Sequence, residues 1–161
     1  MASSIKGTTV YSVDSSALIH AWRRAYPPEN FPPFWDRLDG LIAAKRLYSS
    51  IEVLNELKRK DDDLHDWCKK RSGLFLPIDD TLQDHVIEIM GTYPRLGDTV
   101  TGRSGADPFV IGLARKHDPE WVVVSEENPG KQRIPDVCKA ENIRCIRLLQ
   151  LIKEEGWVFK G

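Results

Sequence analysis

The chain has 161 residues, of which 41% are apolar and 29% are charged, and its formal net charge is −1. This length fits one domain of ordinary size, and the apolar fraction suffices for a hydrophobic core. No apolar run approaches the roughly 18 residues that a transmembrane helix requires. The N-terminal residues lack the apolar stretch and cleavage site of a secretory signal. We therefore expect a single domain, residues 1–161, without a membrane-spanning helix.

Cysteine usage and charge limit the class of protein further. Cys68, Cys138 and Cys145 are widely spaced and form no C-x-x-C pair. Such cysteines are typical of a reduced, cytoplasmic protein. The near-neutral charge neither supports nor excludes a nucleic-acid partner, because a bound cation neutralises carboxylates that the formal charge counts as negative. The local basic surface therefore matters more than the net charge.

The predicted elements alternate between helices and short strands. Start signals for helices include the run Asp14-Ser15-Ser16, a proline at position 33, and the capping-box spacing of Ser49 and Glu52. The apolar runs VYSV, WVVV and IRCI are typical of strands covered on both faces. Helices are expected at residues 17–25, 33–45, 49–60, 64–71, 79–90, 107–116, 135–141 and 148–155. Strands are expected at residues 9–13, 121–124 and 143–146, with candidate extended segments at 74–78 and 157–159.

This alternation predicts a fold class. Strands that are separated by helices favour a three-layer α/β/α sandwich with a mainly parallel central sheet. Residues 91–105 are the longest loop candidate, and a loop of this length in a compact domain is usually functional or disordered. We find no repeat and no domain boundary, so the sheet is expected to organise the whole chain.

Four acidic residues fall where such a sheet would gather them. Asp14 follows the first strand, Glu56 lies on the helix of residues 49–60, Asp107 begins a helix, and Glu127 follows WVVV. Ligands of open α/β sheets bind beyond the carboxyl ends of the strands. Converging carboxylates raise each other's pKa, and a divalent cation removes that penalty. Because the ligand atoms would all be oxygen, we expect Mg²⁺ or Mn²⁺.

Each acid also has a purely structural interpretation. Asp14 fits a helix N-cap, and so does Asp107, which precedes a proline. Glu52 fits the capping box better than a ligand position, and Glu127 fits a solvated loop. Glu56 follows Glu52 by four residues on one helix face, where like charges disfavour each other unless a cation or basic group intervenes. The ordered set of acids, and no single residue, therefore predicts the site.

The ordered blocks resemble the PIN-domain family, which includes the VapC-type toxins of toxin–antitoxin pairs. Family members open on a strand that ends in Asp before a small polar pair, here VYSVDSSALI. They continue with a helix of the type S-x-x-x-x-x-E-L, here SSIEVLNEL with Glu56, and an Asp that leads an apolar helix, here ADPFVIGLA with Asp107. An apolar strand then ends in Thr or Ser before an acid, here VVVSEE with Ser125 and Glu127. The stretches YPPENFPPFWDRL and IPDVC are similar to one bacterial subgroup of PIN proteins.

The resemblance implies a PIN-like fold and a Mg²⁺- or Mn²⁺-dependent endoribonuclease. Such a protein is often a homodimer and acts as a toxin beside an antitoxin protein. The implied catalytic residues are Asp14, Glu56, Asp107 and Glu127, and the implied metal ligands are Asp14, Asp107, Glu127 and Asp136. The family pattern has Asp near position 127, so Glu126, Glu127 and Asp136 remain alternatives for the fourth position, and Asp136 equally fits a helix cap. Because Glu replaces that Asp, a non-catalytic PIN-like module that binds RNA or protein is the alternative hypothesis.

Supporting and substrate-binding candidates flank the acids. Ser16 and Ser125 are placed to orient a carboxylate or a water, although local capping is an equally open role. Glu52 is a further supporting candidate on the helix of Glu56. Residues expected to bind RNA phosphates are Arg103, Lys131 and Arg133, with Arg23 and Arg24 as additional candidates.

Overall fold

A computed structural model describes residues 8–97, 105–117 and 120–159 of the chain. The strands are β1 (Val10–Val13), β2 (Leu47–Ser50), β3 (Phe75–Leu76), β4 (Trp121–Val124) and β5 (Cys145–Ile146). The α-helices are α1 (Ser15–His20), α2 (Pro32–Ala43), α3 (Ile51–Lys60), α4 (Asp62–Lys69), α5 (Asp80–Thr92), α6 (Asp107–Lys116), α7 (Ile134–Ala140) and α8 (Leu148–Glu155). A π-helical turn, η2 (Ala21–Ala25), continues α1, and a 3-10 helix, η3 (Ser72–Leu74), precedes β3.

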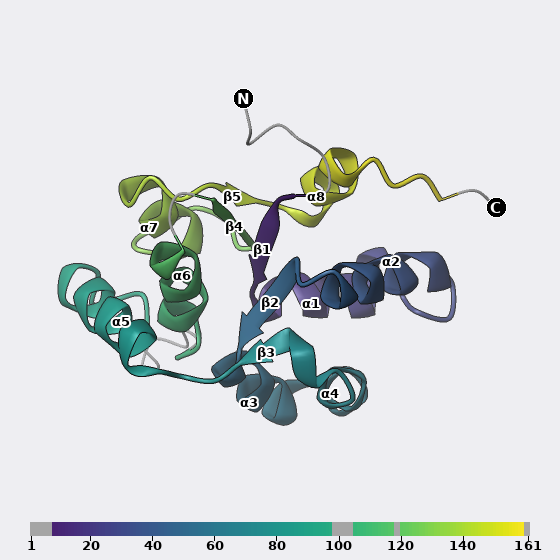
Figure 1. The fold of residues 1–161 in the computed structure, drawn as a ribbon, viewed down its shortest axis with the longest axis horizontal. Coiled ribbons are helices and arrows are strands. Elements are labelled where there is room, and N and C mark those ends of the chain that lie inside the picture. Colours follow the sequence, from purple (N-terminus) through teal and green to yellow (C-terminus); the bar gives the residue numbers. More distant parts are fainter. Residues whose placement is uncertain (1–7, 98–104, 118–119, 160–161) are drawn as a thin grey trace.

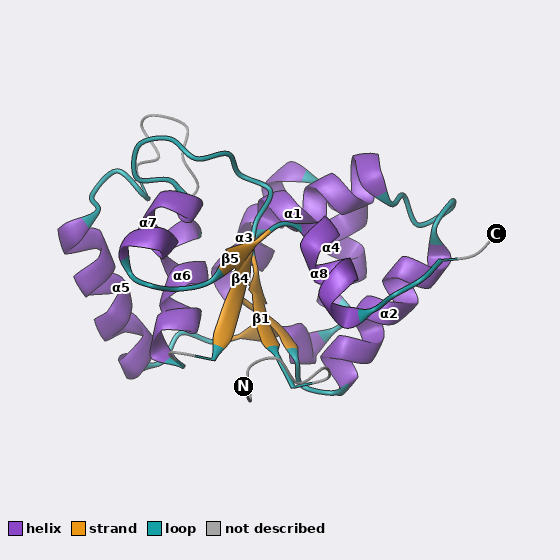
Figure 2. Cartoon of the chain, turned by 90° about the horizontal axis from the view of Figure 1, so that it is seen from above, coloured by secondary structure: helices purple, strands orange, loops and turns teal. Residues whose placement is uncertain are grey.

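The strands form one five-stranded sheet in the order β3-β2-β1-β4-β5, and every neighbouring pair is parallel. Helices α5, α6 and α7 lie on one side of this sheet, and α1, α2 and α8 lie on the other (Figures 1 and 2). Parallel strands need crossover connections, and here helices supply them and cover both faces. The predicted three-layer α/β/α sandwich is therefore confirmed.

Strand β1 lies at the centre of the sheet and determines where the next residue is placed. Val13 of β1 pairs with Val124 of β4, and the Asp14 N–H donates to the Val124 carbonyl at 3.1 Å. Both valines are buried, as expected for strands that are covered on both faces. Because the two strands are parallel and in this register, the residues that follow them lie side by side at one edge of the sheet.

Two buried hydroxyls inside the sheet fix the elements around that edge. The Ser12 Oγ donates to the Val110 carbonyl of α6 at 2.8 Å. The Ser49 Oγ of β2 donates to the Val13 carbonyl of β1 at 2.6 Å. A buried hydroxyl needs such a partner, because leaving it unpaired costs about 1–3 kcal/mol. These bonds therefore hold α6 and β2 against the carboxyl end of β1.

Aromatic side chains pack α2 against α4 and η2. Phe34 and Trp35 of α2 are buried. The Trp35 ring lies 4.9 Å from Trp67 and 5.1 Å from Trp22, between ring centroids, and both contacts are edge-to-face. Such pairs contribute about 0.5–1.5 kcal/mol each beyond the area they bury. Trp22 belongs to η2, so this packing also secures the continuation of α1.

The structure corrects the predicted elements at two places. The capping box of Ser49 and Glu52 is wrong, because Ser50 is the N-cap of α3 and its Oγ accepts from the Glu52 N–H. The preceding residues form the strand β2, which the sequence pattern of a helix start concealed. Residues 157–159 form no strand, and Trp157 instead packs on Phe34 with 6.1 Å between ring centroids.

Other expectations concern the described part of the chain as a whole. None of its helices is long and apolar enough to cross a membrane. Cys68, Cys138 and Cys145 are all free thiols. The central part of the predicted loop 91–105 falls on residues 98–104, so Arg103 lies outside the described residues.

Candidate metal centre

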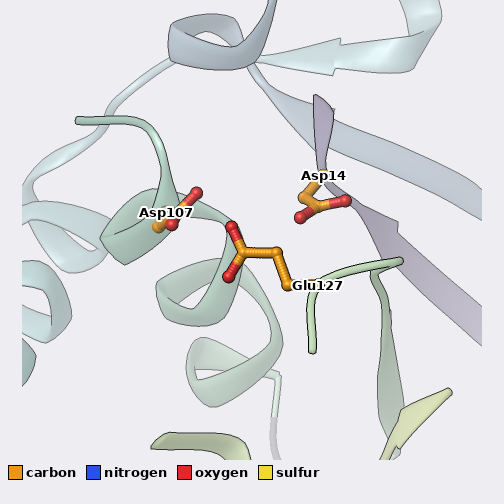
Figure 3. Close-up of side chains that lie close together, drawn as sticks. All are labelled: Asp14, Asp107 and Glu127. Carbon is orange, nitrogen blue, oxygen red and sulfur yellow. The ribbon is translucent and has the colours of Figure 1, made fainter. Parts of the chain in front are cut away.

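Three carboxylates converge at the carboxyl edge of the sheet. Asp14 follows β1, Glu127 follows β4, and Asp107 is the first residue of α6, which packs against both strands. One oxygen of each carboxylate lies within 4.8 Å of the corresponding oxygen of the other two. Figure 3 shows the Glu127 side chain extending toward Asp107, and in this view Asp14 lies on the opposite side of Glu127 from Asp107. The structure therefore brings together three of the residues that the sequence singles out.

Asp14 is held in one orientation by hydrogen bonds to both of its oxygens. The Ala17 N–H donates to Oδ1 at 3.0 Å, so Asp14 is the N-cap of α1. The Ser16 Oγ donates to Oδ1 and Oδ2 at 2.8 and 2.9 Å, and the Ser125 Oγ donates to Oδ2 at 2.9 Å. Capping and ligation are thus compatible for this residue, because a carboxylate offers about four lone-pair sites.

Asp107 differs from Asp14 because it is not the N-cap of its helix. The N-cap of α6 is Ala106, which makes no side-chain capping bond, and Asp107 occupies the first helical position. Its side chain is 3% exposed. The capping interpretation of Asp107 is therefore wrong, and its carboxyl group faces the other two acids.

Glu127 is tethered at both ends. Its N–H donates to the Ser125 Oγ at 3.1 Å, and its Oε1 accepts from the Ile134 N–H of α7 at 3.3 Å. Ser125 therefore links two acids, because its hydroxyl donates to Asp14 while it accepts from Glu127. Hydrogen bonds of this kind, around the groups that bind an ion, set the orientation of the ligands.

The electrostatics of the group are unfavourable as long as no cation is bound. Burial raises the pKa of Asp14 from 3.8 to about 7, and the charge of Glu127 adds to this rise while the three hydrogen-bond donors oppose it. Burial raises the pKa of Asp107 to about 9, with further contributions from the charges of Glu127, Asp14 and Glu56. A cation between these oxygens would remove both effects. An all-oxygen donor set fits Mg²⁺ or Mn²⁺, so the residues suit the predicted cofactor.

Glu56 completes the acidic surroundings from α3. It is 3% exposed, and its Oε2 accepts from the Lys60 Nζ at 2.8 Å. Its Oε1 is the one buried side-chain oxygen or nitrogen of the described residues that has no hydrogen-bond partner. An unsatisfied buried acceptor is costly and requires an explanation. Lys60 was not singled out from the sequence, although its position four residues after Glu56 has the favoured order for an ion pair on a helix.

The other candidates for the fourth position have different partners. The Glu126 Oε2 accepts from the Leu148 N–H at the start of α8. The Asp136 Oδ2 accepts from the N–H groups of Gly130 and Arg133, which caps α7. Neither residue belongs to the converging group among the described residues. Of the three alternatives, Glu127 is the one that lies with Asp14 and Asp107, and the predicted ligand Asp136 has the capping role that was its alternative.

The remaining supporting candidates are divided between the site and the surface. Ser16 and Ser125 contact Asp14, as described above. Glu52 lies in the first turn of α3 and is not a member of the converging group. Lys131 is exposed on the loop before α7.

A cavity of about 400 Å³ opens beside the carboxylates. Glu127, Glu56 and Ser16 contribute to its lining, whereas Asp14 and Asp107 are buried and do not. Four lysine and arginine side chains also line it, namely Arg23, Arg24, Lys60 and Arg133, together with Ser15, Ile19, His20 and Glu126. The predicted Arg133 is thus placed at the cavity, and so are the additional candidates Arg23 and Arg24.

Comparisons with known proteins show which structures and which family this chain is similar to. The chain is similar to a crystal structure of FitAcB from Neisseria gonorrhoeae, with a TM-score of 0.52 and 16% sequence identity over 85% of this chain and 96% of that chain. This likeness shows a shared fold, in agreement with the predicted three-layer α/β/α sandwich. No curated protein sequence matches the chain. Residues 11–159 match the family described as Domain of unknown function (DUF4411). Because this match spans nearly the whole chain, the protein belongs to the DUF4411 family.

Proposed function

We propose that this protein is a metal-dependent endoribonuclease that hydrolyses RNA phosphodiester bonds with Mg²⁺ or Mn²⁺. The observation that carries the proposal is the convergence of Asp14, Asp107 and Glu127 within 4.8 Å at the carboxyl edge of a parallel sheet. None of the three forms an ion pair with a lysine, arginine or histidine of the described residues. Their arrangement therefore calls for a cation from outside the chain.

The side chains of the site divide the chemical work. A divalent cation, when bound, lowers the pKa of an attacking water and stabilises the charge that develops on the phosphoryl group. Asp14, Asp107 and Glu127 would hold it, and Ser16 and Ser125 keep the Asp14 carboxylate in place for this purpose. Preorganised ligands of this kind need no rearrangement when the substrate binds.

The proposal extends to the biological role. The sequence blocks around Asp14, Glu56, Asp107 and Glu127 resemble those of VapC-type toxins, and the fold is PIN-like. We therefore propose that the protein is the toxin of a toxin–antitoxin pair and that an antitoxin protein inhibits it. Induced expression should slow growth, whereas expression of Asp14→Asn should not. Equal growth of the two strains would contradict the toxin role. Homodimer formation and a cytoplasmic location stay predictions of the resemblance.

The nuclease proposal is tested with purified protein and a labelled RNA. Cleavage should require Mg²⁺ or Mn²⁺, stop with EDTA, and be lost in Asp14→Asn. Asp79→Asn is a matched control, because Asp79 also caps a helix through its side chain but is exposed, as the N-cap residue before α5. Calorimetric titration with Mn²⁺ distinguishes the nuclease from the alternative, a non-catalytic module that binds RNA or protein. Absence of Mn²⁺ binding at millimolar concentration would favour the non-catalytic module.

A further inference from the structure

The cavity beside the carboxylates is lined by side chains of both charges. Its acidic residues are Glu56, Glu126 and Glu127, and its arginine and lysine residues are Arg23, Arg24, Lys60 and Arg133. Its volume of about 400 Å³ is of the size that accommodates a small ligand. A polyanion that enters this cavity therefore meets these cations.

The arginine and lysine side chains that line the cavity differ in whether they already form an ion pair with an acid of the protein. Arg23 is engaged, because its Nε contacts the Asp61 Oδ2 and its Nη2 donates to the Lys60 carbonyl, both at 2.7 Å. Lys60 donates to Glu56. In contrast, neither Arg24 nor Arg133 forms an ion pair with any acid that the structure describes.

The backbone brings these two arginines to the cavity from different elements. Arg24 lies on η2, the π-helical turn that continues α1 from Asp14. Arg23 and Arg24 both line the cavity, although consecutive residues of a helix point in different directions. Such π-helical turns frequently occur at functional sites. Arg133 is the N-cap residue of α7, six residues after Glu127. The chain thus places two guanidinium groups around one opening, each on a segment that also carries a residue of the metal centre.

We propose that Arg24 and Arg133 bind a backbone phosphate of the RNA substrate, namely the one that neighbours the phosphate at the metal centre. The proposal rests on the proposed nuclease function. Guanidinium groups present planar pairs of N–H donors that match two phosphate oxygens. Lys60 adds a third cation to the lining, because one of its three donors is used by Glu56 and the others stay available. The two arginines would hold the strand in position while the carboxylates serve the scissile bond.

The test measures binding of a short fluorescent single-stranded RNA by anisotropy, in Asp14→Asn protein so that the probe stays intact. Adding Arg24→Gln and Arg133→Gln should weaken binding by about 10-fold to 100-fold. Because both arginines bind one phosphate, the negative slope of log affinity against log salt concentration should become shallower by about 0.7. The control removes two charges elsewhere, through Arg37→Gln and Lys139→Gln, which are exposed and do not line the cavity. Thermal melts confirm that all variants are folded.

The outcomes separate this proposal from the nuclease proposal. Equal weakening by the cavity pair and the control pair, or an unchanged salt slope with the cavity pair, would overturn the phosphate site even if the protein cleaves RNA. Weakening by the cavity pair alone would support the site even if no cleavage is found with any metal. In an active protein, the two arginine substitutions should raise KM more than they lower kcat, and the reverse result would place these residues in the chemistry instead of in substrate binding.

Discussion

The substitution Asp14→Asn is expected to stabilise the cation-free protein while it removes the response to Mg²⁺ or Mn²⁺. Asp14 is 1% exposed, and its pKa rises from 3.8 to about 7, chiefly through burial. A carboxyl group whose pKa is raised on folding makes its full contribution to stability below its unfolded pKa. Its stabilising contribution is lost as the pH rises from about 4 to about 7. Asparagine is as good an N-cap as aspartate but cannot ionise, so it avoids this loss.

The size of the effect follows from the same pKa values. A rise from 3.8 to about 7 corresponds to about 4 kcal/mol above neutral pH, since each pKa unit is worth about 1.4 kcal/mol. Asn accepts fewer hydrogen bonds from Ser16 and Ser125 than a carboxylate does, which offsets about 2 kcal/mol. We therefore expect a net gain of about 2 kcal/mol near pH 8, or a Tm rise of about 4–8 °C for a domain of this size.

Thermal unfolding followed by circular dichroism in EDTA measures this gain. The gain should shrink as the pH is lowered toward about 4, and added Mn²⁺ should raise the Tm of the original protein but not that of the variant. Asp79→Asn serves as control, because the ion pair with Lys116 lowers the pKa of Asp79, so removing its charge should give no stabilisation. A lower Tm for Asp14→Asn near pH 8, or a gain that does not depend on pH, would refute the reasoning.

Three other predictions concern the site and its support. Affinity for Mn²⁺ should tighten at least about tenfold between pH 6 and pH 8, because the cation must displace protons from Asp14 and Asp107, with pKa values of about 7 and 9. Calorimetry in buffers of different ionisation enthalpy should show the released protons. An affinity that does not change with pH would contradict this. Ser125→Ala should lower Mn²⁺ affinity about tenfold or more but stability by only about 1 kcal/mol, since its hydroxyl orients Asp14; unchanged affinity would exclude that role. Gly112→Ala should destabilise the fold by about 1–3 kcal/mol in denaturant unfolding, because an added Cβ would lie 3.0 Å from the Leu82 Cδ1, while Mn²⁺ affinity of the folded protein stays the same.

The location of the acidic group could be predicted from the sequence because it depends on chain topology. Asp14 and Glu127 directly follow strands with clear apolar patterns, and parallel strands place their carboxyl ends at one edge. Asp107 begins a helix with an equally clear pattern. These three positions needed no knowledge of side-chain packing. Their role as ligands stays a proposal until a cation is shown to bind.

Details that depend on tertiary contacts could not be predicted in this way. Glu126 and Glu127 are adjacent, and only the position of α8 decides that Glu126 binds the Leu148 N–H instead of facing Asp107. The strand β2 has four residues, and its Ser49 and Ser50 carry the signal of a helix start, so the local pattern favoured the wrong element. The role of Ser49 depends on Val13, which is 36 residues away.

The most direct test of the central claim is the rate of cleavage of a defined RNA during titration of Mn²⁺ into the original protein and Asp14→Asn side by side. The proposed function predicts no cleavage in EDTA, saturable cleavage whose half-maximum matches the Kd from calorimetry, and no cleavage by the variant. Cleavage that persists in EDTA, or cleavage by Asp14→Asn at the original rate, would contradict it.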